Sequence, residues 1–149
     1  MATIGAAAIA RALGFSANRT IIEKSNPAAG AFTILKVMIY ADQAMQNVEV
    51  ATFQNIGGNT FTTRNTAFLG DVPAGYSEHG VSIGAEAGDY IGCHYSAGKV
   101  SLDTVGGVGT WYLEGDYIPC SGQVFSYVAD YKISLSGDDV APVSVAIAD

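Results

Sequence analysis

Charged side chains are scarce in this 149-residue sequence: Asp, Glu, Lys and Arg make up 14% of it, against about 25% in average soluble proteins. Lys and Arg together number seven, and the formal net charge is -7. A nucleic-acid-binding protein needs clustered basic side chains to displace counterions from the phosphate backbone. The sequence has no such cluster, so we expect no nucleic-acid partner. Few charges also leave neutral surface, which is tolerated best when other subunits cover it.

Cysteine is almost absent as well. Cys93 and Cys120 are too few for a disulfide framework and too widely spaced for a CxxC redox or zinc motif. We expect both to be buried thiols, with a disulfide between two strands as the alternative.

Long apolar runs and export signals are also missing. No run approaches the about 18 to 20 residues that a helix needs to cross a membrane, so we expect no membrane partner. Residues 1–14 lack the basic start of a signal peptide, and Arg11 falls where its apolar centre would lie. The sequence therefore predicts a protein that is made in a cytoplasm and carries no secretory signal.

Glycine, by contrast, is abundant, and its 18 residues help to divide the sequence into short runs. Several runs alternate apolar and polar residues with the period of two that is typical of strands. In residues 89–95 this alternation predicts that Ile91, Cys93 and Tyr95 point inward. The predicted strands cover residues 20–24, 31–40, 48–54, 60–65, 76–83, 89–95, 99–105, 110–113, 123–127, 131–135 and 140–147.

So many short strands favour two packed layers, because one open sheet would leave a face and two edges unprotected. We predict an all-β fold, a two-sheet antiparallel β-sandwich of jelly-roll type. Residues 20–149 form the single sandwich domain, and residues 1–19 form a short N-terminal arm or helix.

The arm is the exception to the strand pattern. Residues 6–13 are predicted as a helix that is too short to be stable alone in water. The arm must therefore dock, either on its own domain or on a neighbouring subunit as an assembly device. Its apolar side chains are Ile4, Ile9, Leu13 and Phe15.

Catalytic motifs are missing. No GxSxG elbow surrounds a serine, and His79 and His94 have no motif context. We therefore predict no catalytic residue, no cofactor and no enzyme activity. Asp89 and Asp116 are weak calcium candidates at predicted turns, but Asp residues at turns usually bond their own loop, so we predict no metal.

Aromatic side chains form the most suggestive group. Trp111, Tyr112 and Tyr117 follow one another closely, and such rings stack on sugars or anchor a protein partner. In a sandwich of this size, at least half of the aromatic rings are also expected in the core. The sequence leaves both interpretations open.

Two segments carry a resemblance to a known group of proteins. Residues 86–95 (EAGDYIGCHY) and 110–120 (TWYLEGDYIPC) resemble small β-sandwich proteins of unassigned function that are common in tailed-phage genomes and viral metagenomes. The resemblance implies a bacteriophage virion component, such as a head decoration protein, a fibre or an attachment module. It transfers no catalytic residue.

Two functions follow as expectations. The first is a non-enzymatic virion structural protein, a capsid decoration, cement or fibre-type surface protein that forms homo-oligomers and docks on other virion proteins. The alternative is a carbohydrate-binding or host-attachment module that binds a glycan through Trp111, Tyr112 and Tyr117.

Overall fold

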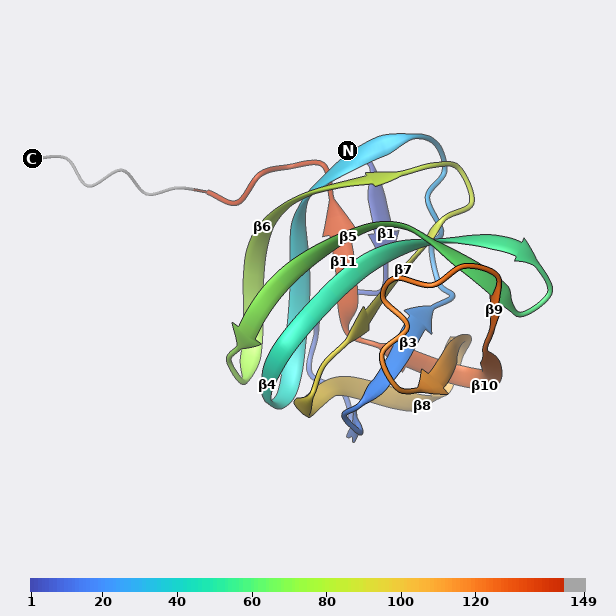
Figure 1. The fold of residues 1–149 in the computed structure, drawn as a ribbon. Coiled ribbons are helices and arrows are strands. Elements are labelled where there is room, and N and C mark those ends of the chain that lie inside the picture. The colour runs from blue at the N-terminus through green and yellow to red at the C-terminus, as the bar shows by residue number, and fades with distance from the viewer. Residues whose placement is uncertain (144–149) are drawn as a thin grey trace, which may run out of the picture.

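The computed structural model describes residues 1–143, and every regular element in this part of the chain is a β-strand (Figure 1). The strands are β1 (Thr3–Gly5), β2 (Leu13–Phe15), β3 (Arg19–Glu23), β4 (Phe32–Gly57), β5 (Thr60–Val72), β6 (Gly75–Ala85), β7 (Tyr90–His94), β8 (Ala97–Glu114), β9 (Gln123–Val124), β10 (Ser126–Ile133) and β11 (Leu135–Asp138). All their pairings are antiparallel. The predicted all-β, antiparallel fold is confirmed. No helix that could cross a membrane occurs in the described residues.

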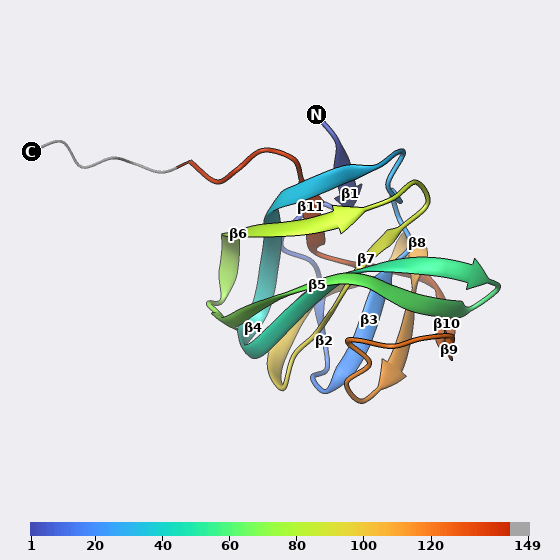
Figure 2. The ribbon, with the colours of Figure 1, turned by 45° about the horizontal axis from the view of Figure 1, so that its top comes forward.

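Backbone hydrogen bonds join these strands into one sheet, with β4 at its centre. The first half of β4 pairs with β6 and β11, and the second half pairs with β5 and β7. Between the halves, Ala41, Gln43 and Gln46 pair with β8 through register shifts, and Asn47 has a φ of 53°. Such irregularities bend a strand, so β4 turns and the sheet curves back on itself (Figure 2). The two predicted sheets are thus not separate, and the jelly-roll arrangement is not confirmed.

Apolar side chains gather in two groups, which we call the main core and the second core. The main core contains Ile21, Ile34, Val37, Ile39, Val48, Val50, Ile91, Cys93, Tyr95, Val100, Ile133 and Leu135, among others. The second core contains Ile22, Ala51, Phe53, Phe61, Trp111, Ile118 and Phe125. Successive residues of a strand point to opposite faces, and the neighbours Ile21 and Ile22 belong to different cores. The strands at the centre of the molecule are therefore covered on both faces.

The predicted inward set of β7 is confirmed. Ile91 and Cys93 are buried in the main core, and so is Tyr95, which directly follows the strand. The Tyr95 hydroxyl donates to the Phe15 carbonyl oxygen at 2.6 Å. Gly92, between them, has no room for a side chain, because a Cβ there would lie 2.5 Å from the Ile21 carbonyl oxygen.

The segment between β8 and β10, which includes the two-residue strand β9, covers the second core (Figure 1). It buries Ile118 and Phe125 against the sheet. Its backbone is fixed at several points: the Tyr117 amide donates to Thr20 Oγ1 at 2.9 Å, and Thr63 exchanges bonds with Cys120. We call residues 115–125 the covering segment.

One carboxyl group lies inside the protein. Glu23 is fully buried, and its Oε1 accepts the Ile133 amide at 2.7 Å. Its Oε2 accepts the amide and the hydroxyl of Ser25. Burial disfavours the charged form and outweighs these bonds, so the pKa of Glu23 is raised above its ordinary value of 4.5.

The raised pKa of Glu23 predicts a pH-dependent stability. A carboxyl group that holds its proton more tightly when folded contributes fully below its unfolded pKa, and this contribution is lost as pH rises through the folded pKa. Relative to Glu23→Gln, the wild type should lose free energy of unfolding as pH rises above the ordinary carboxyl pKa of 4.5. Urea unfolding of both proteins at each pH measures the difference. If the free energy of unfolding of the wild type instead rises with pH relative to that of Glu23→Gln, the raised pKa of Glu23 is contradicted.

The helix predicted over residues 6–13 is wrong. β1 pairs with β11 and β2 pairs with β8, and the residues between them are irregular. Arg11 holds this stretch in place with a side chain that is only 5% exposed. It donates to Ser134 Oγ at 2.7 Å and to Asp103 Oδ2 at 2.8 Å, which lowers the pKa of Asp103. An isolated helix of this length is not stable in water. The contacts of Arg11 stabilise an irregular conformation in its place.

The predicted arm, residues 1–19, docks on its own domain. Ile4 and Phe15 are buried in the main core. Ile9 and Leu13 remain about half exposed. Of the four apolar arm residues, only these two are therefore available to a neighbouring subunit.

The structure describes residues 140–143 of the last predicted strand, 140–147. Residues 140–143 are irregular, so the prediction is wrong for them. Residues 144–147 lie outside the described part of the chain.

Candidate functional site

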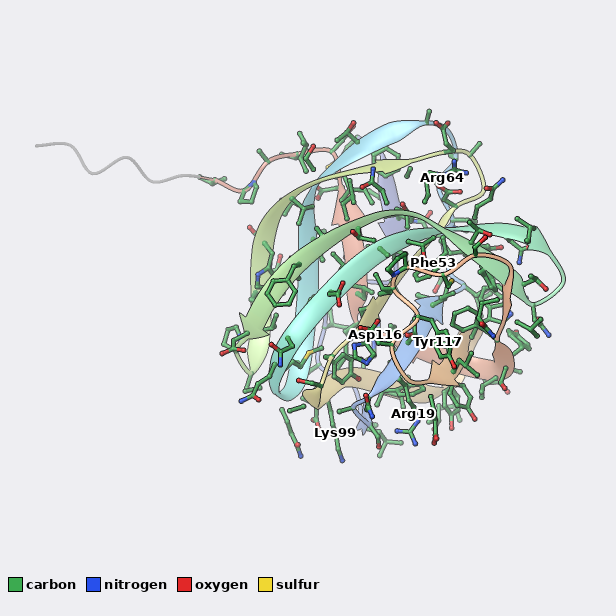
Figure 3. All side chains as sticks on the ribbon, viewed as in Figure 1. Arg19, Phe53, Arg64, Lys99, Asp116 and Tyr117 are labelled. Carbon is green, nitrogen blue, oxygen red and sulfur yellow. The ribbon has the colours of Figure 1, made fainter. Side chains whose placement is uncertain are left out.

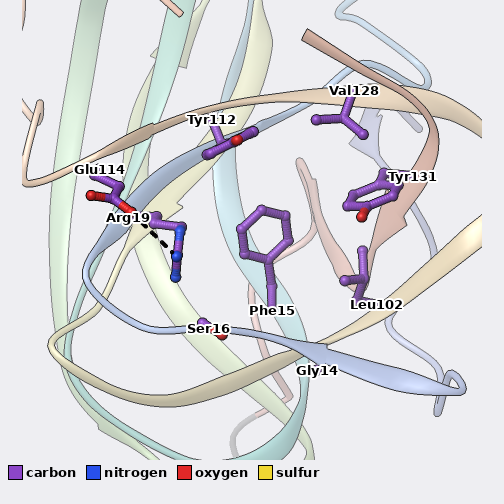
Figure 4. A pocket seen from close by; sticks show the side chains of 9 residues that line it. All are labelled: Gly14, Phe15, Ser16, Arg19, Leu102, Tyr112, Glu114, Val128 and Tyr131. Atoms are coloured by element: carbon purple, nitrogen blue, oxygen red, sulfur yellow. Dashed lines mark hydrogen bonds and ion pairs between the residues drawn. The ribbon is translucent and has the colours of Figure 1, made fainter. Parts of the chain in front are cut away.

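The described surface contains a pocket of about 260 Å³, lined by aromatic and apolar side chains (Figure 4). Phe15 stands between Tyr112 and Tyr131, with ring centroids 5.9 and 6.2 Å away and ring planes steeply inclined. Leu102 and Val128 complete the apolar wall. The three aromatic residues come from β2, β8 and β10, so the register of the sheet assembles this pocket.

One end of the pocket is charged. Arg19 on β3 and Glu114 on β8 are paired across the two strands, and Arg19 Nη2 lies 3.4 Å from Glu114 Oε1. Arg19 Nη1 also donates to the Ala17 carbonyl oxygen at 3.4 Å. These contacts are at the long end of hydrogen-bond distances. The Glu114 side chain is 79% exposed, so its carboxylate remains accessible to a ligand.

The structure does not bring Trp111, Tyr112 and Tyr117 together on one surface. Trp111 is buried in the second core, 4.7 Å from Phe61 between ring centroids, and its Nε1 donates to Asn59 Oδ1 at 2.9 Å. Tyr112 faces the other side of β8 and lines the pocket. Tyr117 lies half-buried on the covering segment, against Phe125. Of the predicted ligand-binding residues, only Tyr112 lies in the pocket.

A second polar group surrounds His94. Glu49 and His94 are cross-strand partners on β4 and β7, and His94 Nδ1 lies 3.9 Å from Asp116 Oδ2. Burial, followed by the nearby charge of Asp116, raises the pKa of Glu49. His94 Nε2 is buried and has no hydrogen-bond partner among the described residues. The described residues contain no group of three His, Cys, Asp or Glu arranged to hold a metal.

The two weak calcium candidates, Asp89 and Asp116, lie apart, and each accepts hydrogen bonds from other groups of the protein. The Asp89 carboxylate is buried and is held by the Arg64 guanidinium and the Glu86 amide. A cation would compete with Arg64 for those oxygens. Asp116 Oδ1 accepts the Ile118 amide at 3.0 Å. Figure 3 shows Arg64, which bonds Asp89, well away from Asp116.

The remaining histidine and the cysteines have structural surroundings. His79 Nε2 is 2.8 Å from Ser77 Oγ on the same strand, and burial lowers its pKa. Cys93 and Cys120 are free thiols, and the predicted burial of both is confirmed only for Cys93. Cys93 is fully buried, and burial raises its pKa to about 12, whereas Cys120 is only partly buried. A thiol with such a pKa is unreactive at neutral pH.

Sequence reasoning missed most of the pocket. Phe15 was predicted as part of the assembly arm, and Arg19, Glu114 and Tyr131 were not singled out. Arg19 and Glu114 are 95 residues apart, and only the register of β3 against β8 makes them neighbours. One signal was present: successive residues of a strand face opposite sides, so Trp111 and Tyr112 cannot share a surface. No protein-family model and no curated protein matches the chain.

Proposed function

We propose that the chain is a non-enzymatic virion structural protein, a capsid decoration, cement or fibre-type surface protein that self-assembles and docks on other virion subunits. The observation that carries the proposal is exposed apolar surface on a protein with few charges. Large apolar side chains that are more than half exposed include Phe68 (67%), Val105 (79%), Ile56, Tyr76, Val108 and Val124. Burial of such groups against a neighbouring subunit stabilises an oligomer.

A free strand edge supports assembly. β6 has 11 residues and pairs only with β4 among the described strands. An unpaired edge of this length is a site for pairing with another chain unless it is protected. In an oligomer, a neighbouring subunit covers it.

The proposal includes the finer architecture and the location. We infer that the two halves of the curved sheet act as the two layers of a jelly-roll sandwich around the main core. The protein is made in the host cytoplasm and resides in the virion. Its partners are further copies of itself and other virion proteins, and nucleic acid and membranes are not among them. The resemblance of residues 86–95 and 110–120 to phage proteins supports this location.

The molar mass in solution tests self-assembly. We expect light scattering at about 10 µM to give a multiple of the 15.4 kDa chain mass. The double variant Phe68→Ser, Val105→Ser should dissociate more readily, because it loses exposed apolar area. Gln54→Ser, at an exposed polar position on β4, is the matched control and should keep the wild-type mass. A wild type that remains monomeric up to about 100 µM contradicts the proposal.

The second candidate is a carbohydrate-binding or host-attachment module. The observation that favours it is the pocket of Phe15, Tyr112 and Tyr131 beside the Arg19–Glu114 pair, because aromatic rings with a few polar groups are typical of ligand sites. An array of glycans probed with the labelled protein tests this candidate. Absence of binding to every glycan contradicts it.

A further inference from the structure

We infer that the pocket lined by Phe15, Tyr112, Tyr131, Arg19 and Glu114 binds one neutral sugar ring, the terminal residue of a glycan. This inference rests on the attachment proposal and is independent of the capsid proposal. It assigns the ligand class and the residues that hold it.

The aromatic side chains suit the apolar face of a sugar. Tyr112 and Tyr131 are only partly buried, and Phe15 fills the space between them. Carbon-bound hydrogens of a sugar ring pack against aromatic faces, as apolar groups generally do. Within the described residues, neither tyrosine hydroxyl bonds another protein group, so both are available to sugar hydroxyls.

The charged end suits a pair of neighbouring hydroxyls. A sugar hydroxyl both donates and accepts hydrogen bonds, the guanidinium of Arg19 only donates, and the carboxylate of Glu114 only accepts. The two groups lie side by side at 3.4 Å, so adjacent sugar hydroxyls find one donor and one acceptor. Charge-assisted bonds of this kind are stronger than those between neutral groups.

Charge and size narrow the ligand class. Glu114 balances Arg19, and the chain has a net charge of -7, so a carboxylated sugar would be repelled. The pocket volume of about 260 Å³ is below the roughly 300 Å³ at which pockets for drug-sized ligands begin. The space therefore suits a single ring and not an oligosaccharide.

Ligand-detected NMR tests the inference with defined probes. Methyl glycosides of galactose, glucose and mannose, each at about 10 mM, are compared with glucuronic acid. We expect saturation transfer from the wild type to at least one neutral glycoside, and a markedly weaker signal for glucuronic acid. Affinity for that glycoside should fall about tenfold in Tyr131→Ala and in Arg19→Met, because each loses a ligand contact.

The control is Tyr127→Ala, on the same strand as Tyr131 but outside the pocket. It should bind like the wild type. Circular dichroism shows whether each variant is folded, and Arg19→Met, which keeps an apolar stem, provides the test if Tyr131→Ala does not fold. Equal binding by the wild type and both pocket variants overturns the inference, as does binding of glucuronic acid alone or of no probe.

The glycan array separates this inference from the attachment proposal. Retained binding of an array glycan by a folded Arg19→Met and Tyr131→Ala leaves attachment standing and removes this pocket as its site. If both pocket variants lose array binding and Tyr127→Ala keeps it, the result supports the attachment proposal and this pocket as its site.

Discussion

Replacing Gly98 with alanine should lower the free energy of unfolding by about 4 kcal/mol. Gly98 has a φ of +85°, which disfavours any residue with a Cβ, and that Cβ would lie 2.1 Å from the Ala44 carbonyl oxygen. The glycine lies where β8 meets the bend of β4, between the pairs Ala97–Gln46 and Lys99–Gln43. A side chain at residue 98 would push β8 away from the bend of β4. Urea unfolding followed by circular dichroism measures the loss.

Gly75 provides the matched control for this prediction. Its φ is +89°, nearly the same as that of Gly98, but a Cβ would meet nothing within 4 Å. Gly75→Ala should therefore cost only the backbone conformation, about 1–2 kcal/mol. Equal losses in the two variants would show that the close approach of β8 to β4 is absent.

Phe61→Ala should also be strongly destabilising, by about 3–5 kcal/mol. Phe61 is fully buried, and its ring lies 4.7 Å from Trp111 and 5.7 Å from Phe125 between centroids. Truncation leaves a cavity at the centre of the second core and removes these aromatic contacts. The fluorescence of Trp111, the single tryptophan, follows unfolding from within that core.

Phe68→Ala on the same strand is the control. Phe68 is 67% exposed, so its loss should change the free energy of unfolding by less than about 0.5 kcal/mol. Both variants are measured at about 0.5 µM, where dilution suppresses association. A small effect of Phe61→Ala, similar to that of Phe68→Ala, would mean that the second core does not stabilise the fold.

The alternation of apolar and polar residues predicted the strands well where their side chains are buried in a core. The predicted strands 20–24 and 89–95 correspond to β3 and β7, and the inward direction of Ile91, Cys93 and Tyr95 is confirmed. These residues fill a core, so their pattern is visible in the sequence.

The long β4 was not predictable in the same way. The sequence predicts strands 31–40 and 48–54, with polar residues such as Asp42, Gln43 and Gln46 between them. The structure continues the strand through this stretch, because it pairs with β8 and passes through bulges. Pairing with a distant strand leaves no local signal in the sequence.

The candidate site also depends on pairing between strands that are distant in the sequence. Tyr112 was predicted because it is an aromatic residue near others. Its actual neighbours, Phe15 and Tyr131, come from strands on either side of it in the sequence, and Arg19 faces Glu114 through the pairing of β3 with β8. A single sequence predicts that strands pair but not their register, and the register decides which side chains share a pocket.

Amide hydrogen exchange most directly tests the central claim, that the middle strands are covered on both faces. The covering segment is fixed through the amides of Tyr117 and Cys120, and the Thr63 amide donates to the Cys120 carbonyl oxygen. We predict that these three amides exchange at least about a hundredfold more slowly than in an unfolded chain. If Tyr117 and Cys120 exchange as fast as an unfolded chain, the outer face of the sheet is open and the account is contradicted.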